Sequence, residues 1–124
     1  LQGIGVSKGD FVGILAPNCL EFEIAFFGIL KAGATVTTIN SGYRDREIAA
    51  QLATSGAAVL IVHDSLQEMA EAAAKDTPSL QRLIVINDTA EDSESFWGLL
   101  GAASGEPTPS EIDPVHDLAA LPFS

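Results

Sequence analysis

The chain of 124 residues contains a single cysteine, Cys19, and few basic residues. One cysteine excludes an internal disulfide and a cysteine-rich metal site, and it is typical of a reducing compartment. Six Lys and Arg against 17 Asp and Glu give a net charge of −11. This charge repels phosphate backbones, so we do not expect nucleic acid as a partner.

Long apolar runs and a targeting leader are also missing from the sequence. Charged residues interrupt the longest apolar run before it reaches the roughly 18 residues of a membrane span, so we expect no transmembrane segment. No basic and apolar leader opens the chain, which indicates an intracellular protein. A hydrophobic fraction of 47% is nevertheless enough for a packed core.

The segment 11–40 predicts a strand, a helix and a second strand. Asn18 is the predicted cap of the helix Leu20–Ala32, with Glu21 three residues further on, as in a capping box. Because this helix has so few charged residues, we expect it to be buried nearly all round. Gly33 is expected to end it in the left-handed conformation.

Strands and helices continue to alternate along the chain. Apolar runs predict strands at Phe11–Ala16, Ala57–Val62, Leu83–Ile86 and Val115–Phe123, and β-branched residues predict a strand at Ala34–Ile39. Helices are predicted around 48–53 and 66–73, the latter capped by Asp64 or Ser65, and residues 88–113 are predicted to be a long surface connection. We therefore expect residues 1–124 to form one α/β unit, a doubly wound, mostly parallel sheet with helices on both faces.

Ligands of such sheets bind beyond the carboxyl ends of the strands. Residues 16–18, 40–42, 63–64 and 87–88 follow the predicted strands at these ends. They include no nucleophile–base pair, no metal cluster and no phosphate loop. Each remaining candidate has a structural and a functional interpretation: Cys19 as structural or reactive thiol, His63 and His116 as loop residues or ligands, Arg44 as helix-start residue or anion contact, Trp97 as packing anchor or stacking platform. We assign no catalytic or metal-binding residue.

The two ends of the chain suggest a fragment. The sequence begins with Leu1 and closes on the predicted strand Val115–Phe123, with no turn or cap after it. A cut sheet leaves apolar surface and an open edge, so we expect the fragment to self-associate through exposed sheet surface.

Several segments together resemble the acyl-adenylate-forming enzymes, and most of all the branch of 4-coumarate–CoA ligases, luciferases and fatty acyl–CoA synthetases. The pattern is G-V-S-K-G-D-F-V at 5–12, P-N at 17–18 and A-F-F-G-I-L-K-A-G-A at 25–34, followed by Asn40, Tyr43, Glu47, Gln51-Leu52 and 55–57. The closing D-L-A-A-L-P-F-S at 117–124 resembles the strand that precedes the family's phosphate loop. Two positions depart from the pattern: Ser41 replaces a proline, and Arg44 replaces a capping threonine, so that we expect Asp45 to cap the next helix.

The resemblance implies a longer enzyme that joins a carboxylic acid to coenzyme A with ATP and Mg²⁺, in the cytoplasm or a peroxisome. Ser124 matches the first residue of the phosphate loop, and the rest of that loop is not in the sequence. We therefore expect an N-terminal fragment that is inactive alone and binds none of these cofactors. The alternative, which the strand–helix alternation leaves open, is a non-catalytic flavodoxin-like binding or interaction module.

Overall fold

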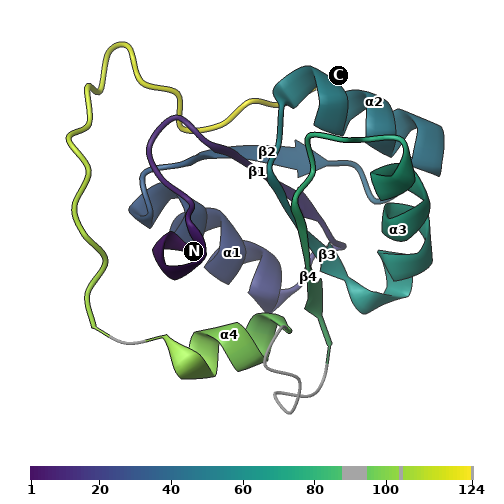
Figure 1. The fold of residues 1–124 in the computed structure, drawn as a ribbon, viewed down its shortest axis with the longest axis horizontal. Coiled ribbons are helices and arrows are strands. Elements are labelled where there is room, and N and C mark those ends of the chain that lie inside the picture. The colour runs from purple at the N-terminus through teal and green to yellow at the C-terminus, as the bar shows by residue number, and fades with distance from the viewer. Residues whose placement is uncertain (88–94, 104, 124) are drawn as a thin grey trace.

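The computed structural model describes residues 1–87, 95–103 and 105–123, and a parallel sheet forms its centre (Figure 1). The sheet has four strands in the order β2-β1-β3-β4. In chain order the elements are η1 (Gln2–Ile4), β1 (Phe11–Leu15), α1 (Leu20–Lys31), β2 (Thr35–Ile39), α2 (Asp45–Ser55), β3 (Val59–His63), η2 (Asp64–Leu66), α3 (Gln67–Lys75), β4 (Arg82–Ile86) and α4 (Phe96–Ala102). Continuous apolar runs thus form strands, as predicted for a sheet that is covered on both sides.

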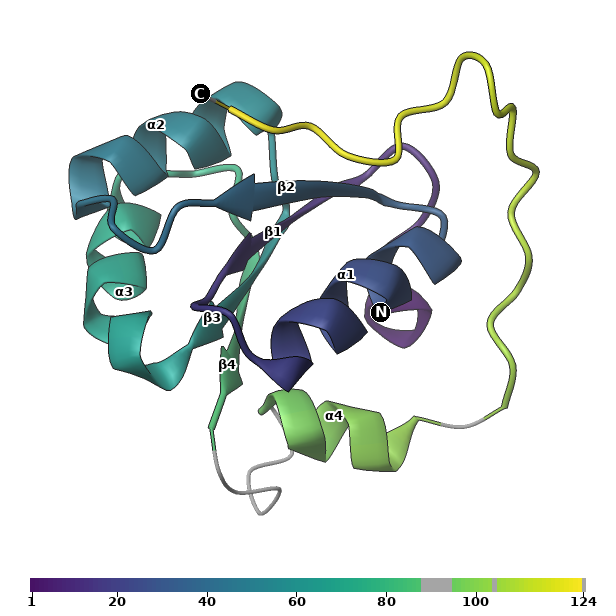
Figure 2. The same ribbon diagram turned by 180° about the vertical axis from the view of Figure 1, so that it is seen from behind.

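Each face of the sheet has its own apolar core, because successive side chains of a strand point to opposite faces. Ile14 of β1 faces α1 and α4, where it packs with Ile29 and Phe96. Its neighbour Leu15 faces α2 and α3, where it packs with Leu52. Figures 1 and 2 show α1 and α4 on one side of the sheet and α2 and α3 on the other. The predicted α/β sheet with helices on both faces is confirmed.

Helix α1 differs from the prediction in its start and in its burial. Its N-cap is Cys19 instead of Asn18, and no side chain caps it. Only Ala25 and Ile29 are buried, whereas Leu20 and Phe27 are each 66% exposed. The predicted burial all round is wrong because α1 covers one face of the sheet and, among the described residues, no element packs on its outer side. None of the described helices combines the length and the apolar character of a membrane span.

The end of α1 follows the prediction. Gly33 has a φ of 87°, in the left-handed region that favours glycine. Its N–H donates to Leu30 O at 2.9 Å, and the N–H of Ala34 donates to Ile29 O at 3.1 Å, which is the Schellman pattern. The chain can therefore turn sharply from α1 into β2.

The start of α2 corrects a second predicted cap. Arg44 is the N-cap and Asp45 is the first helical residue. The carboxylate of Glu47 accepts a hydrogen bond from the Arg44 N–H at 2.8 Å. The predicted cap at Asp45 is wrong, because Glu47 reaches back to the helix start and stabilises it without a threonine.

Residues 105–123, which we call the strap, connect α4 to the free edge of β2 (Figure 2). The predicted strand Val115–Phe123 is wrong. Only Ala120 forms an isolated parallel bridge, with Val36 of β2. The reason is a turn at the start of the segment, where the N–H of Asp117 donates to Asp113 O at 2.9 Å. Of the predicted connection 88–113, residues 88–94 and 104 lie outside the described residues, and α4 occupies part of the remainder.

Candidate functional site

The carboxyl ends of the four strands lie in register at one edge of the sheet. Leu15 of β1 pairs with Ile39 of β2 and Val62 of β3, and Val62 pairs with Val85 of β4. β2 lies on one side of β1 and β3 on the other, so the direction of winding reverses at β1. Ligands of parallel α/β sheets bind beyond the carboxyl ends at such a switch point. This edge is therefore the candidate site.

The polar side chains that follow β2 and β3 bind to their own loops. The Oδ1 of Asn40 accepts a hydrogen bond from the Gly42 N–H at 2.8 Å. The Nδ1 of His63 accepts from the Ser65 N–H at 3.2 Å and lies 2.7 Å from the Ser65 Oγ. His63 thus caps the turn η2 before α3. The cap predicted for the third helix at Asp64 or Ser65 is wrong, because the turn η2 takes up 64–66 and α3 begins only at Gln67, with Leu66 as its N-cap and no side-chain cap.

The end of β4 adds Asn87, whose buried Oδ1 has no hydrogen-bond partner among the described residues. Its predicted neighbour in the site, Asp88, lies outside those residues. Within 1–87, 95–103 and 105–123, no three His, Cys, Asp or Glu side chains lie close enough to hold a metal ion. In the part that is described, this edge supplies loop-forming polar groups and no complete catalytic or metal-binding set.

The other candidates from the sequence lie apart from one another. Cys19 is partly buried and packs against the apolar core beneath α1. Trp97 packs edge-on against Phe96, with ring centroids 5.4 Å apart, as expected of a packing anchor. His63 ends β3, whereas His116 lies at the opposite, amino edge of the sheet. The two histidines therefore do not form a common site.

The strap extends the sheet beside β2 and runs parallel to it. The Val36 N–H donates to Ala119 O at 2.9 Å, and the Leu121 N–H donates to Val36 O at 2.7 Å. Two threonine hydroxyls of β2 add side-chain bonds to the strap: Thr35 to Leu118 O at 3.0 Å and Thr37 to Leu121 O at 2.8 Å. A parallel neighbour of β2 leads toward the carboxyl edge. The predicted site residue Ser124 follows this segment and lies outside the described residues.

Gln51 of α2 is a polar residue whose role the sequence patterns missed. It is 5% exposed, and its Nε2 donates to the Thr37 Oγ1 at 3.1 Å and to Thr38 O at 2.9 Å. Its spacing of three residues from the buried Ile48 places it on the inner face of the helix. An amide on an apolar face requires a hydrogen-bond partner, and that requirement is the signal that would have found it.

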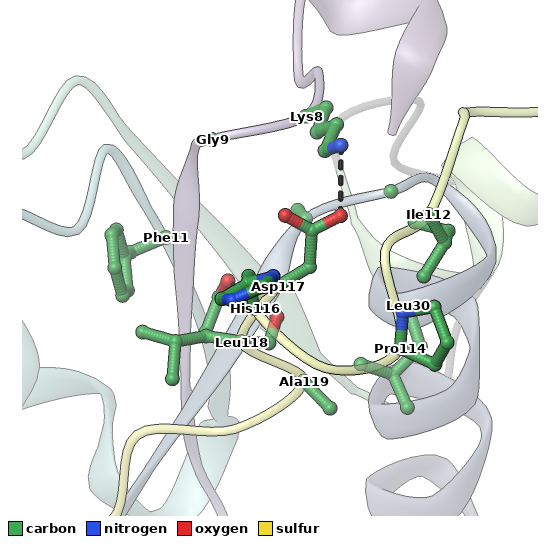
Figure 3. Close-up of a pocket in the computed structure, with 13 residues that line it drawn as sticks. Lys8, Gly9, Phe11, Leu30, Ile112, Pro114, His116, Asp117, Leu118 and Ala119 are labelled. Atoms are coloured by element: carbon green, nitrogen blue, oxygen red, sulfur yellow. Dashed lines mark hydrogen bonds and ion pairs between the residues drawn. The ribbon is translucent and has the colours of Figure 1, made fainter.

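A hollow of about 730 Å³ lies at the amino edge of the sheet, between the strap and the starts of β1 and β2 (Figure 3). Its lining is mostly apolar and includes Phe11, Leu30, Ile112 and Leu118. Parallel sheets bind ligands at the other edge. We therefore do not assign the chemistry of the protein to this hollow.

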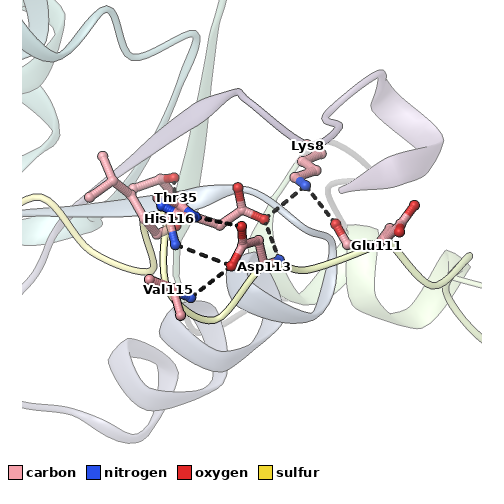
Figure 4. Close-up of polar contacts among 8 residues, drawn as sticks. Lys8, Thr35, Glu111, Asp113, Val115 and His116 are labelled. Carbon is pink, nitrogen blue, oxygen red and sulfur yellow. Dashed lines mark hydrogen bonds and ion pairs between the residues drawn. The ribbon is translucent and has the colours of Figure 1, made fainter.

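Polar contacts anchor the strap beside this hollow (Figure 4). The Nζ of Lys8 lies 2.8 Å from the Asp117 Oδ2 and donates to Glu111 O at 2.6 Å. The Nδ1 of His116 lies 2.7 Å from the Asp113 Oδ2. The hydrogen bond from His116 lowers the pKa of Asp113, and the hydrogen bond from Lys8 lowers the pKa of Asp117. The contacts of Lys8 hold the strap against the loop before β1, whereas the contact of His116 with Asp113 lies within the strap.

Comparison with known proteins identifies the family. A family model described as "AMP-binding enzyme" matches residues 1–124. The chain belongs to this family. The resemblance to acyl-adenylate-forming enzymes is thus confirmed, although the strand order alone is also that of the flavodoxin-like alternative. Because the family model matches the whole chain, it favours the acyl-adenylate-forming family over the flavodoxin-like module.

Relatives of the chain include ligases named for two classes of acid. The chain is 40% identical over 84 residues to a long-chain-fatty-acid–CoA ligase of Salmonella typhimurium, covering 68% of the chain and 15% of the relative. It is 37% identical over 125 residues to 4-coumarate–CoA ligase 5 of Oryza sativa subsp. japonica, covering 100% of the chain and 22% of the relative.

A solved structure shows the same fold. The crystal structure of a long-chain-fatty-acid–CoA ligase from Archaeoglobus fulgidus superimposes with a TM-score of 0.88 and 25% sequence identity. The match covers 99% of this chain and 24% of that protein. The chain thus spans less than a quarter of the length of each of these three proteins.

Proposed function

We propose that this chain is part of an acid–CoA ligase. A carboxylate oxygen of the acid attacks the α-phosphorus of ATP, and pyrophosphate leaves. The thiolate of coenzyme A then attacks the carbonyl carbon of the acyl-adenylate, and AMP leaves. The observation that carries this proposal is the 37% identity with 4-coumarate–CoA ligase 5 of rice over the full chain.

The substrate is proposed to be an apolar carboxylic acid. The names of the relatives specify a long-chain fatty acid in one case and 4-coumarate in the other. Both acids have an apolar body behind one carboxylate, and this common chemistry supports the substrate class. Because ATP and coenzyme A are the cosubstrates, we propose that the reaction takes place in the cytoplasm or in a peroxisome.

The chain's own part in this reaction is to position the phosphate loop. The strap runs parallel to β2 toward the carboxyl edge, and Ser124 is proposed as the first residue of that loop. When bound, Mg²⁺ would neutralise charge on the triphosphate. A triphosphate cradle uses successive backbone N–H groups, whereas here the N–H groups of Gly42 and Ser65 bind side chains of their own loops. The described residues therefore do not fit ATP by themselves, and we expect residues 1–124 alone to bind neither ATP nor coenzyme A.

The test is an activity assay of the complete product of the gene that encodes this chain. Pyrophosphate release is followed with ATP, Mg²⁺ and a panel of fatty acids and 4-coumarate, and the acyl-CoA product is identified by mass spectrometry. We expect acid-dependent pyrophosphate release for at least one class of acid. A folded protein that releases no pyrophosphate with any of these acids would refute the proposal. Calorimetry on residues 1–124 tests the second part, and tight ATP binding there would contradict it.

We expected self-association through exposed sheet surface, but helices cover both faces of the sheet. We therefore propose the outer face of α1 as the contact surface. The outer face of α1 presents Phe27 between Glu23 and Lys31, all three exposed. Each charged residue lies four positions from Phe27, so two antiparallel copies of α1 would pair Glu23 with Lys31 twice around a Phe27 contact. The Lys31 Nζ lies 3.9 Å from the Glu106 Oε2 of its own chain, and this exposed ion pair is weak enough to be exchanged for Glu23 of a second copy. The charge complementarity then favours a second copy of the chain as the partner.

Sedimentation equilibrium of residues 1–124 tests this contact. We expect a dimer that dissociates when Phe27 is replaced by serine. The Val115→Ser variant is the control, because Val115 is 80% exposed on the strap and lies outside the proposed contact. A monomeric wild-type chain, or equal weakening by both substitutions, would contradict the proposed contact.

A further inference from the structure

We infer that Gln51 and Thr37 are positioning residues that fix the strap, and through it the start of the phosphate loop. The expected effect on ATP binding rests on the proposed function, whereas the contacts of Gln51 and Thr37 do not depend on that function. Neither side chain is expected to touch a substrate, since both are buried between α2, β2 and the strap.

The number of protons on Gln51 and Thr37 determines which group donates and which accepts in each of their hydrogen bonds. The amide of Gln51 has two N–H groups, and they are used by the Thr37 Oγ1 at 3.1 Å and by Thr38 O at 2.9 Å. The Thr37 hydroxyl therefore accepts from Gln51, and its single proton is donated to Leu121 O at 2.8 Å. The result is a directed chain of hydrogen bonds from α2 through β2 to the strap.

Burial makes this chain of hydrogen bonds hard to replace with water. Gln51 is 5% exposed and Thr37 is 0% exposed. A hydrogen bond shielded from water is electrostatically stronger, and removing one partner leaves the other with its full desolvation penalty. The position of the strap is therefore coupled to the position of α2, the helix that follows the loop at the carboxyl end of β2.

The bond from Thr37 is also the side-chain anchor nearest the proposed loop. Between 118 and 121 the strap has two backbone bonds with Val36 and two side-chain bonds, from Thr35 and Thr37. Thr37 binds Leu121, which lies only three residues before Ser124. Loss of this bond should let the loop shift, and a misplacement of about 1 Å at a reacting group can lower a rate by about 100-fold.

Amide hydrogen exchange tests the contact without reference to activity. In the complete gene product, we expect Thr37→Val to increase the exchange rate of the Leu121 amide by about 10-fold or more, because valine keeps the shape and removes the hydroxyl. Thr37→Ser, which keeps the hydroxyl, should restore protection. Thr38→Val is the matched control, since among the described residues no partner binds the Thr38 hydroxyl and only its carbonyl is used. Equal effects of Thr37→Val and Thr38→Val, or no effect of Thr37→Val, would overturn the inference.

The variant Gln51→Glu supplies a readout that a merely structural role would not move. An ionised carboxylate has no proton to donate to the Thr37 Oγ1 or to Thr38 O, whereas a protonated one has a single donor. Burial raises the pKa of such a group. We therefore expect the protection of Leu121, measured relative to wild type at the same pH, to rise as the pH falls in this variant only. Protection that does not change with pH in Gln51→Glu would contradict the proton arrangement.

Steady-state kinetics then test the consequence for ATP. We expect Thr37→Val to raise the KM for ATP about 10-fold or more with little change in the KM for the acid, and Thr37→Ser and Thr38→Val to behave like the wild type. Increased exchange of Leu121 in Thr37→Val with an unchanged KM for ATP would overturn the positioning role. A wild-type protein with no activity would refute the proposed ligase function instead, and the exchange measurements would still decide the contact.

Discussion

Replacement of Gly33 by alanine should destabilise the fold through two separable effects. The φ of 87° lies in the left-handed region, where a side chain costs about 1 kcal/mol or slightly more. An added Cβ would also lie 2.3 Å from the Ser110 Oγ and 2.9 Å from the Ser110 Cβ, well inside the usual contact of about 3.5 Å. The strap must then move away from the end of α1.

The movement would disturb a neighbouring pair of hydrogen bonds. Gln2 donates to Thr108 O at 2.8 Å and accepts from the Thr108 N–H at 2.8 Å. These bonds lie two residues before Ser110, and each contributes about 0.5–1.5 kcal/mol when it is well shielded and less at an exposed site. We expect Gly33→Ala to cost about 2 kcal/mol or more in total, of which about half comes from the strap.

Gly56→Ala separates the two effects. Gly56 ends α2 with a φ of 70°, and an added Cβ there meets nothing within 4 Å. It should therefore cost only the backbone part, about 1 kcal/mol. Urea unfolding followed by the fluorescence of Trp97 gives the free energies, and Ser110→Gly in the Gly33→Ala background should recover the strap part. Equal costs at the two glycines, with no recovery by Ser110→Gly, would refute the close packing of the strap on α1.

Further measurements test the core and the acid sensitivity of the strap. Leu60→Ala should lower the free energy of unfolding by about 2–5 kcal/mol, because Leu60 is 0% exposed, whereas Leu20→Ala should change it by no more than about 0.5 kcal/mol. The pKa values of Asp113 and Asp117 in the fold are lowered from 3.8, so their contribution is complete above about pH 4 and is lost as the pH falls through the lowered pKa values. Amide protection of the strap should therefore fall below about pH 4, and Lys8→Met should weaken this dependence by removing the partner of Asp117.

Most of the sheet could be predicted from the sequence because its strands are short, continuous apolar runs. That composition is typical of strands covered on both faces, and it holds for β1 and β3, whereas β2 was predicted from its β-branched residues. The same rule failed at Val115–Phe123, since apolar composition alone determines neither burial nor strand pairing. The segment keeps Val115 80% exposed and Leu118 56% exposed, and only Ala120 bridges to β2.

Helix α1 shows a second limit of composition. Its apolar side chains predict burial on all sides, yet Leu20 and Phe27 are largely exposed. A hydrophobic pattern states which side chains avoid water, and it does not state which segment covers them. The site has the same limit. Topology predicts the carboxyl edge, whereas it does not predict that Gln51 binds Thr37 and Thr38, or that Thr37 in turn binds Leu121, which is distant in sequence.

The segments that identify the family meet one another in space without forming a catalytic group. Lys8, in the pattern at 5–12, pairs with Asp117, in the pattern at 117–124, at 2.8 Å. Gly33, in the pattern at 25–34, has no side chain and so leaves room for Ser110 of the strap. Each of these contacts fixes where the strap crosses the molecule, and the bond from Thr37 to Leu121 fixes how it reaches the carboxyl edge. Lys8 and Gly33, two of the identifying residues of this chain, are therefore best explained by the need to hold one segment in place.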